Sequence, residues 1–393
     1  MATHTAELTI RTAAREKYAP ITLCHFTTVH TELKSRTFHR ELMPLAAGGM
    51  GVRYVAPMKG GARDGVNFVA IRKRKSRMSR ALALPALLIT LLRQRASLYH
   101  FQDPELLPLA FALKTFRKRV VYDAYEDFPS MAASSASIPR FLRPMAAKLV
   151  ASTEQLAARC FDGLMTADPS TLRRLARSGN SRKLVFYNFP NLVFFPAPVP
   201  HAKAFDVVYR GGLSERAGTF VLLEAMRLLA GRQAPPRLLL LGYFDDRAAE
   251  AALRGRIRAL GLDSQIEIRG RMDHAEMAAA LDEARIGVCP LQAVPKFLMN
   301  IPVKVFEYWA CGLPVIASDL PPIRPFLRNS GAGILHAPEN AAELAESIAR
   351  LLDDPGKAER MGARGRELVV QRFHNGAEVH KLRRFCMQAA GRL

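Results

Sequence analysis

Lys304 and Glu307, a cation and a carboxylate, lie three positions apart within residues 300–319, whose sequence is NIPVKVFEYWACGLPVIASD. Residues with this spacing share one face of a helix, and Pro302 suits the first position of a helix. A short helix starting there would present both charges together. At the carboxyl end of a parallel sheet, this pair suits a sugar nucleotide, with Lys304 on a phosphate and Glu307 on ribose hydroxyls. The alternative is a surface ion pair between them, which would contribute less than about 1 kcal/mol to stability.

A glycine pair lies ahead of a second candidate cation. Gly211 and Gly212 follow the strand-like residues 206–210, and a helical pattern begins just after Arg216. Glycines let backbone amides come close to a phosphate, and the start of a helix carries partial positive charge. Arginine can donate two parallel hydrogen bonds to a diphosphate. A Gly-Gly pair alone indicates only a turn, but together with Arg216 and Lys304 it predicts a phosphate-binding loop.

Residues 300–319 resemble the donor-binding signature of family 4 of the retaining glycosyltransferases, which have the GT-B fold. That signature is Pro-x-Lys-x-x-Glu-Tyr, followed by a small residue, Gly, Pro and Val-Ile-Ala-Ser-Asp. Three more segments, residues 100–108, 122–127 and 209–218, resemble blocks of the same family in the same order. The resemblance implies an α/β protein with two Rossmann-like domains, whose parallel sheets face each other across a cleft. It also implies a C-terminal helix that crosses back to the first domain.

The resemblance further implies roles for individual residues. The catalytic groups would be Arg216, Lys304 and Glu307. The donor site would also contain Gly211, Gly212, Gly270, Arg271, Asn300 and Pro302. Of these, Gly270 and Arg271 lie where relatives contact the base. The acceptor side would contain Arg36, Asp103, Asp123, Tyr125 and Glu126.

Three positions depart from the family pattern. The first acid of the family's Glu-x7-Glu motif falls on Met299, although Asn300 and Pro302 resemble a sub-branch in which an Asn-x-Pro turn replaces that acid. The lysine that follows the arginine in many relatives is Ala217, and the histidine of the first domain is Tyr125. Tyrosine, with a pKa near ~10, is a poor general base, so proton abstraction by Tyr125 is not expected. A retaining front-face reaction does not need it, because an oxygen of the departing phosphate can accept the proton of the acceptor.

Two acceptor-side residues have plain structural alternatives. For Tyr125 the alternative is an aromatic residue packed at the end of a strand. For Asp103, which precedes Pro104, the alternative is a helix cap followed by proline at the first helical position, and this is favoured over catalysis. Arg36 begins the segment 36–41, which resembles the family's Asp-x-Arg-x-x-x-x-Glu block. We expect that segment to lie on the acceptor side.

The chain has 393 residues, a length that predicts two domains. Six strand-like apolar runs in each half alternate with helical patterns, as is typical of parallel α/β domains. We expect an N-terminal acceptor domain at 18–190, a linker at 191–204, a nucleotide-sugar donor domain at 205–370 and a C-terminal helix at 371–393 that packs on the first domain. The linker contains three prolines within five residues, which cannot continue a helix or a central strand.

No metal or other cofactor is expected. The chain has no Asp-x-Asp motif, and its five cysteines are scattered without a Cys-x-x-Cys pair, so neither a zinc site nor a disulfide framework is indicated. The first 17 residues lack the apolar core of a signal peptide. The longest apolar run, residues 81–92, is shorter than the roughly 20 residues of a membrane span. We expect a cytoplasmic protein, peripheral at the inner face of the cell membrane.

The net charge of +22, from 57 Lys and Arg against 35 Asp and Glu, favours binding to a polyanion. Basic residues cluster at 72–80 and within 138–149, where Phe141, Leu142 and Met145 are interspersed with cations. A basic amphipathic helix is typical of a membrane-surface element, so an anionic membrane surface is the expected partner. An ordinary solvated face is an equal alternative. No nucleic-acid-binding motif is present, and nucleic acid is not an expected partner.

The sequence therefore predicts a retaining, metal-independent hexosyltransferase. It would move a sugar from a nucleotide-sugar donor to a glycan or lipid-linked acceptor in the synthesis of a surface polysaccharide, whether exopolysaccharide, capsule or lipopolysaccharide. One alternative is a catalytically degenerate GT-B protein that binds nucleotide or glycan without turnover, because Met299 and Tyr125 replace family residues. The other is a polyanion-binding protein, which the charge alone suggests.

Overall fold

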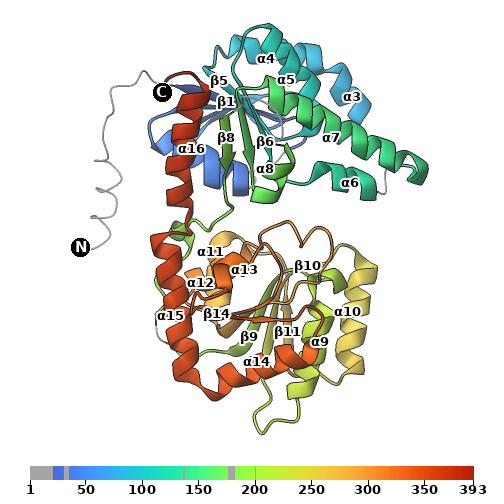
Figure 1. Ribbon diagram of the computed structural model, residues 1–393, viewed down its shortest axis with the longest axis vertical. Coiled ribbons are helices and arrows are strands. Elements are labelled where there is room, and N and C mark those ends of the chain that lie inside the picture. Colours follow the sequence, from blue (N-terminus) through green and yellow to red (C-terminus); the bar gives the residue numbers. More distant parts are fainter. Residues whose placement is uncertain (1–20, 31–34, 136–137, 176–181, 200) are drawn as a thin grey trace.

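The computed structural model describes residues 21–30, 35–135, 138–175, 182–199 and 201–393. Within these residues the chain forms two α/β domains, drawn one above the other in Figure 1. The expected start of the first domain, residues 18–20, lies outside the described residues, as do the residues before it.

An eight-stranded sheet forms the centre of the first domain, in the order β3-β4-β2-β1-β5-β6-β7-β8. Its strands are β1 (Thr22–Phe26), β2 (Gly51–Ala56), β3 (Gly61–Arg63), β4 (Val66–Ala70), β5 (Leu98–Phe101), β6 (Val120–Ala124), β7 (Gly163–Thr166) and β8 (Arg182–Val185). The pair β3–β4 is antiparallel, and the other pairs are parallel. The sequence did not predict β3 and β8, which lack buried apolar runs.

Helices cover both faces of this sheet. They are η1 (Ser35–Leu42), α2 (Met43–Ala47), α3 (Arg77–Leu82), α4 (Leu84–Arg93), η2 (Pro104–Leu106), α5 (Leu107–Thr115), α6 (Phe128–Ser134), η3 (Arg140–Leu142), α7 (Arg143–Cys160) and α8 (Pro169–Leu175). Apolar residues of α4, α5 and α7 pack together on one face. Those of η1 and α2 pack with the C-terminal helix on the other face.

The second domain has a six-stranded, all-parallel sheet in the order β11-β10-β9-β12-β13-β14. Its strands are β9 (Phe205–Gly212), β10 (Leu238–Tyr243), β11 (Ile266–Arg269), β12 (Ala284–Cys289), β13 (Val315–Ser318) and β14 (Gly333–His336). The connecting helices are η4 (Leu192–Phe194), η5 (Glu215–Ala217), α9 (Thr219–Leu229), α10 (Arg247–Ala259), α11 (His274–Asp282), α12 (Lys304–Ala310), α13 (Arg324–Leu327) and α14 (Ala341–Asp353). The four consecutive leucines that begin β10 are all fully buried, as is typical of a strand covered on both faces.

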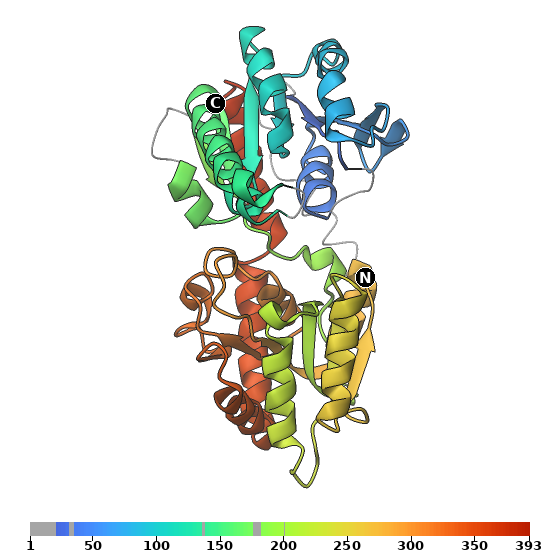
Figure 2. The same cartoon turned by 90° about the vertical axis from the view of Figure 1, so that its right-hand side faces the viewer.

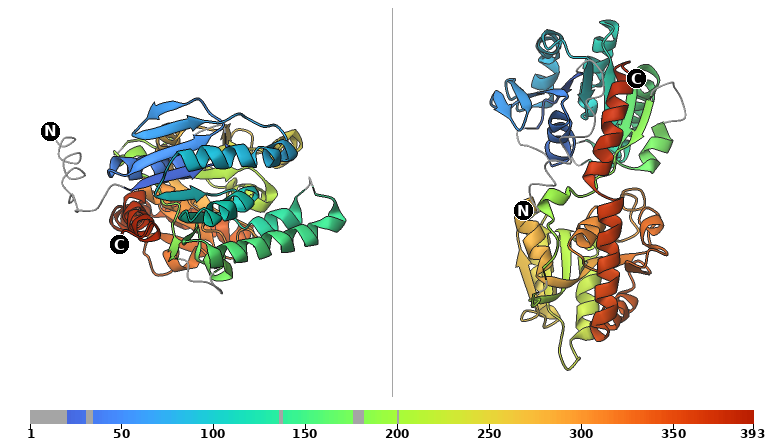
Figure 3. Two further views of the ribbon diagram at one scale, coloured as in Figure 1. Left: turned by 90° about the horizontal axis from the view of Figure 1, so that it is seen from above. Right: turned by 90° about the vertical axis from the view of Figure 1, so that its left-hand side faces the viewer.

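Two C-terminal helices, α15 (Pro355–Gln371) and α16 (Asn375–Ala389), run along both domains. Figure 3 (right) shows α15 against the second domain and α16 continuing upward against the first. Leu382, Phe385 and Cys386 of α16 are buried in the core of the first domain. The crossing C-terminal helix that the sequence predicts is therefore confirmed.

Helix α15 also fixes α12, the helix that carries Lys304 and Glu307. Every residue of α12 is buried. A Cβ atom on Gly362 of α15 would lie 1.9 Å from the carbonyl oxygen of Gly312, just after α12. The two helices can approach this closely because position 362 has no side chain.

We expect Gly362→Ala to destabilise the second domain by about 1–3 kcal/mol, because the added methyl group meets backbone that cannot move aside. A matched control is Gly255→Ala in the middle of α10, where a Cβ has no neighbouring atom within 4 Å. That change should stabilise the domain by about 0.5–1 kcal/mol, the helix-propensity difference between the two residues. Thermal unfolding of both variants measures the difference, and shifts of equal sign would contradict the packing argument.

Candidate functional site

A cavity of about 310 Å³ lies between the two domains. Its walls come from loops at the carboxyl ends of strands in both sheets, where open α/β sheets bind ligands. The predicted residues of the second domain that line it are Gly211, Gly212, Arg216, Asn300, Pro302 and Lys304. The predicted residues of the first domain that line it are Tyr125 and Glu126.

Lys304, the first residue of α12, lines this cavity and is 9% exposed. Its Nζ donates a hydrogen bond of 3.0 Å to the hydroxyl of Tyr209 and lies 4.1 Å from the centre of the Tyr209 ring. Within the described part of the chain Lys304 has no ion pair, so the alternative of a surface pair with Glu307 is wrong. A buried cation without an acid is unfavourable, and an anionic ligand in the cavity would compensate it.

Gly211 lies directly beside this ammonium group. Its φ of +142° is a conformation that L side chains rarely adopt, and a Cβ there would lie 2.8 Å from Lys304 Nζ. The hydroxyl of Tyr209 also donates 2.9 Å to the carbonyl of Gly212. Tyr209 therefore ties the glycine turn to the lysine, and the two form one corner of the cavity. This corner contains the glycine turn and the cation that the sequence predicts for a phosphate site.

Arg216, on the short helix η5, lies at the edge of the cavity with 60% of its side chain exposed. Its Nη2 donates 2.8 Å to Asp245, whose side chain is also half exposed. Exposed pairs of this kind contribute little to stability. A diphosphate carries more negative charge than Asp245 and could compete for the guanidinium.

Glu307 lies behind the cavity and does not line it; its side chain is 1% exposed. One carboxylate oxygen, Oε2, is 2.9 Å from Arg210 Nη1, and the other, Oε1, is 3.7 Å from Arg40 Nη2. No donor among the described residues is aligned to hydrogen-bond Oε2. Glu307 thus keeps an unused acceptor, and its ribose-binding role stays a prediction.

Gly270 and Arg271, which the resemblance predicts to contact the base, are exposed and do not line the cavity. Arg271 does stack over Tyr243, with its guanidinium carbon 4.4 Å from the ring centre. Tyr243 itself lines the cavity. A flat group bound against Tyr243 would lie close to Arg271, which is how that residue could reach a base.

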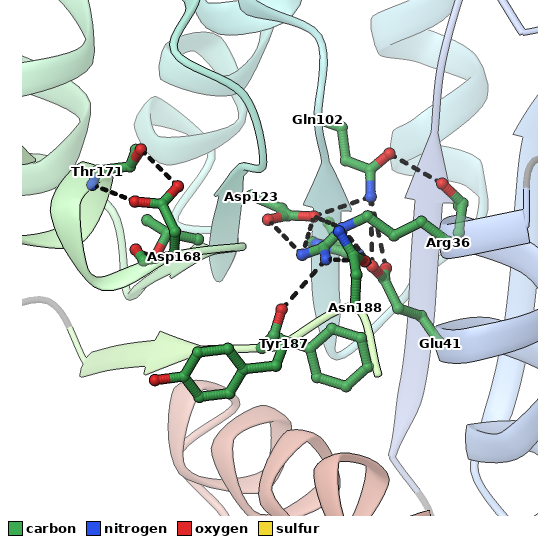
Figure 4. Close-up of polar contacts among 12 residues, drawn as sticks. Arg36, Glu41, Gln102, Asp123, Asp168, Thr171, Tyr187 and Asn188 are labelled. Atoms are coloured by element: carbon green, nitrogen blue, oxygen red, sulfur yellow. Dashed lines mark hydrogen bonds and ion pairs between the residues drawn. The ribbon is translucent and has the colours of Figure 1, made fainter. Parts of the chain in front are cut away.

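Arg36 and Asp123 belong to a buried network in the first domain (Figure 4). Arg36 binds both oxygens of Asp123 at 3.1–3.2 Å and also pairs with Glu41 at 3.1 Å. Burial opposes the charge on Arg36, but Asp123 and Glu41 outweigh it and raise its pKa. Neither Arg36 nor Asp123 lines the cavity. Arg36 Nη1 instead donates 2.6 Å to Asn188, which does line it, so the network positions Asn188.

Asp103 is also buried and lies away from the cavity. Its carboxylate accepts 2.6 Å from the hydroxyl of Thr27 and lies 3.3 Å from His30 Nε2. Pro104 does begin the short helix η2, but the Asp103 side chain makes no capping hydrogen bond to it. The prediction that the Asp103 side chain caps this helix is therefore wrong. That side chain instead joins the loop after β5 to the loop after β1.

Tyr125 and Glu126 follow β6 and face the second domain across the cavity. Burial, followed by the nearby carboxylates of Asp103, Glu126 and Asp123, raises the pKa of Tyr125. The ring meets Phe128 edge-on at 5.6 Å between centroids. Tyr125 is thus a packed, neutral phenol that can donate a hydrogen bond but is a poor base.

The cavity also contains residues that the sequence did not predict as site residues, among them Asp168, Tyr187, Asn188 and Lys296. Asp168 follows β7 and accepts hydrogen bonds from the backbone and hydroxyl of Thr171 (Figure 4). Tyr187 and Asn188 follow β8, a strand that the apolar pattern missed. Recognising β8 would have placed its carboxyl end, and these two residues, at the cleft.

One group of possible metal ligands occurs in the described part of the chain. Ligand atoms of Glu41, His100 and Asp123 lie within 4.8 Å of one another. Burial lowers the pKa of His100 to about 4, which leaves it neutral. Both carboxylates already contact Arg36 at 3.1 Å, so a cation would have to displace a buried guanidinium. The absence of a metal cofactor stays a prediction.

Comparison with known proteins shows which family the second domain resembles. Residues 195–368, which span the second domain from the linker to α15, match the family model described as glycosyl transferases group 1. The second domain is therefore similar to the glycosyl transferases of group 1. The structure is similar to that of HepE from Anabaena in complex with UDP-glucose, with a TM-score of 0.71 and 15% sequence identity. The comparison covers 92% of this chain and 98% of HepE. The two domains together thus have the GT-B fold.

Curated relatives match the chain over shorter lengths. A phosphatidyl-myo-inositol mannosyltransferase of Mycobacterium leprae is 33% identical over 42% of this chain and 41% of its own length. The amylovoran biosynthesis glycosyltransferase AmsK of Erwinia amylovora is 31% identical over 35% of this chain and 34% of its own length. The chain therefore covers less than half the length of these relatives.

In the second domain, the unpaired Lys304 predicts opposite effects on stability and binding. We expect Lys304→Met to raise the free energy of unfolding of the ligand-free protein by about 1 kcal/mol, because an apolar chain of similar length replaces a buried charge. The same change should weaken binding of nucleoside diphosphates at least tenfold. Thermal unfolding and calorimetric titration with UDP, GDP and ADP measure both effects.

The control is Lys203→Met, which removes a part-buried lysine that is paired with Asp282 at 2.8 Å. It should lower stability and leave nucleotide affinity unchanged. If Lys304→Met were destabilising and bound nucleotide normally, the lysine would have a structural role instead.

Proposed function

We propose that this protein is a retaining, metal-independent hexosyltransferase that moves a sugar from a nucleoside diphosphate donor to a glycan or lipid-linked acceptor. The observation that carries the proposal is the buried ammonium of Lys304 beside Gly211, without an acid partner among the described residues. A cavity with such a corner favours an anion, and the diphosphate of the donor supplies one. HepE, which shares the fold, is solved with UDP-glucose bound, which supports this class of ligand.

In the proposed reaction, the bond between the sugar carbon and the diphosphate breaks while the acceptor hydroxyl attacks from the same face. Negative charge grows on the leaving oxygens, near Lys304, Arg216 and the turn at Gly211. Preorganised donors of this kind can each lower a barrier by about 3 kcal/mol. The leaving oxygen takes the proton of the acceptor. Tyr125, a neutral phenol, is then needed only to orient a hydroxyl.

The acceptor would enter from the first domain. Its side of the cavity offers two tyrosines, Tyr125 and Tyr187, together with the polar groups of Glu126 and Asn188. Aromatic faces and hydrogen-bonding groups together suit a sugar ring. AmsK carries the name of an amylovoran biosynthesis enzyme, which supports an acceptor in the assembly of exopolysaccharide, capsule or lipopolysaccharide.

Glu307 is buried behind the cavity. This position favours a second candidate function, in which the protein binds nucleotide without turnover. Incubation with UDP-glucose, GDP-mannose and related donors separates the two functions. Release of the nucleoside diphosphate, by transfer or by slow hydrolysis, supports the enzyme. Tight binding of the same donors with no release supports the degenerate protein.

We expect nucleoside diphosphates to stabilise the protein equally with and without EDTA, because cations and backbone amides face the phosphates. At a ligand concentration one hundred times Kd, the gain in stability should be about 2.7 kcal/mol. Thermal unfolding with UDP, GDP and ADP measures it. A stabilisation that EDTA abolishes and manganese restores would contradict the metal-independent part of the proposal.

A second part of the proposal concerns the membrane. Within the described part of the chain, no helix has both the length and the apolar character of a membrane span. Two apolar side chains, Phe141 of η3 and Met145 at the start of α7, are nevertheless 81% and 64% exposed, and Leu149 of α7 is also 64% exposed. On α3, Met78 and Leu82 are 71% and 76% exposed.

These two helices lie on the same side of the first domain, at the right in Figure 1 and towards the viewer in Figure 2. Residues 72–75 and Arg77 beside α3 are exposed, as are Arg140 and Lys148 beside α7. Arg80 is less exposed than these residues, because its Nε pairs with Glu105 Oε1 at 2.7 Å. Exposed apolar rows flanked by cations match the surface of an anionic bilayer. We therefore include peripheral membrane binding in the proposal, with an acceptor that arrives in the membrane.

The double variant Phe141→Ser/Met145→Ser should bind anionic vesicles at least tenfold more weakly than the unchanged protein, because two apolar anchors are lost. Co-sedimentation with phosphatidylglycerol vesicles measures this. Val193→Ser, at a linker position that is 82% exposed, is the control and should bind normally. Raising salt should weaken binding, since each basic residue near the surface contributes about 1 kcal/mol. Equal binding to neutral vesicles would rule out the electrostatic part.

A further inference from the structure

The carboxylate of Glu307 lies between two arginines that come from different domains. Arg210 belongs to β9 of the second domain, whereas Arg40 belongs to η1 of the first. The distances are 2.9 Å to Arg210 and 3.7 Å to Arg40. Among the described residues, no other ion pair joins the part of the chain before the linker to the part between β9 and α14. The contact is therefore a specific link between the two domains at the donor site.

Arg40 is held where the connections between the domains meet. Its carbonyl oxygen accepts 2.9 Å from the side chain of Asn375, the first residue of α16. The backbone N–H of Asn375 donates 2.8 Å to Pro190, just before the linker. A domain rotation about these crossing segments would move Arg40 less than residues farther out. Arg40 can thus stay near Glu307 when the cleft changes width.

Arg40 meets Glu307 inside the protein and not in solvent. It is 8% exposed, and burial lowers its pKa to about 10, which still leaves it protonated at neutral pH. Arg210 and Arg40 approach different oxygens of the same carboxylate, so the two arginines together fix the orientation of Glu307.

We infer that Arg40 is a positioning residue for the nucleotide: from the first domain, it holds the carboxylate of Glu307 in place to bind the ribose. This inference rests on the proposed function, because it assumes a nucleoside diphosphate donor. It also differs from what the sequence predicts for residues 36–41. Arg36 and Glu41 do lie in the buried acceptor-side network, but the side chain of Arg40 turns to the donor side.

A double-mutant cycle on nucleotide affinity tests the inference with the full chain. UDP, GDP and ADP are titrated calorimetrically into the unchanged protein, Arg40→Met, Glu307→Gln and the double variant. We expect Arg40→Met alone to raise the Kd of the best-bound nucleotide about tenfold. In the Glu307→Gln background the same change should alter Kd less than twofold, because Arg40 acts through that carboxylate.

Two further variants separate positioning from loss of structure. Arg40→Lys keeps the charge and should recover most of the affinity lost in Arg40→Met. Arg53→Met is the matched control; it removes a part-buried arginine of the first domain that donates to the carbonyl of Gln94 and does not line the cavity. It should bind nucleotide normally. In transfer assays Arg40→Met should raise the donor KM more than it lowers kcat.

The outcomes are distinct. Unchanged affinity in Arg40→Met, or an equal loss in both backgrounds, overturns the inference and leaves the proposed function standing. If none of the three nucleotides binds the unchanged protein, the proposed function fails and the inference fails with it. If Arg40→Met does not fold, Arg40→Gln and its combination with Glu307→Gln complete the cycle, and no coupling between them also overturns the inference.

Discussion

Charge balance in the cleft is the constraint on which the rest of the structure depends. The second domain places Lys304, Arg210 and Arg216 around one glycine turn, and among the described residues only Glu307 and Asp245 pair with any of them. Lys304 is the most buried of the three and has no acid partner among the described residues. Because a buried charge without a counter-charge is unfavourable, the charges of the protein's own side chains do not balance at Lys304. An anion of the size of a diphosphate would restore the balance.

The fold prevents this corner from relaxing. Helix α12 carries Lys304 and Glu307, and its Tyr308 accepts 2.8 Å from the backbone of Arg210 and donates 3.1 Å to Val288. These bonds fix α12 to β9 and β12, while α15 presses on it from the other side through Gly362. The lysine therefore cannot withdraw towards solvent without disturbing two strands and a helix. Preorganisation of this kind keeps donors in place for charge that appears only during a reaction.

The sequence predicted those parts of the molecule that depend on neighbours in the chain. The alternation of apolar runs and helices gave all six strands of the second domain, because buried parallel strands are continuously apolar. It missed β3 and β8, whose residues are largely exposed or half-buried. Lys304 and the glycine turn were found because their chemistry is local to short motifs. Their meeting at one corner follows from both lying at the carboxyl ends of strands.

What the sequence could not supply are partners that lie far apart in the chain. Arg36 and Asp123 look like candidate acceptor ligands by motif, yet each satisfies the other in the core. Asp103 has the sequence of a helix cap, but Thr27 takes its carboxylate. In each case the charged side chain pairs with a residue that lies far away in the sequence and not with a neighbour in the chain. Burial and pairing of polar side chains are tertiary properties that motif spacing does not encode.

Arg40 of the first domain contacts Glu307 of the second, close to the point where the chain crosses between the two domains. The crossing at Pro190 and Asn375 lies next to the Arg40–Glu307 pair, so a rotation of one domain about this crossing would move the pair less than residues farther away. Tyr125 and Glu126 lie on loops of the first domain across the cavity from Lys304. The same rotation would displace these two residues farther than Arg40. A nucleotide held at the pivot would stay bound while the acceptor side opens. In the proposed reaction, donor affinity and access of the acceptor would then vary independently within this one cavity.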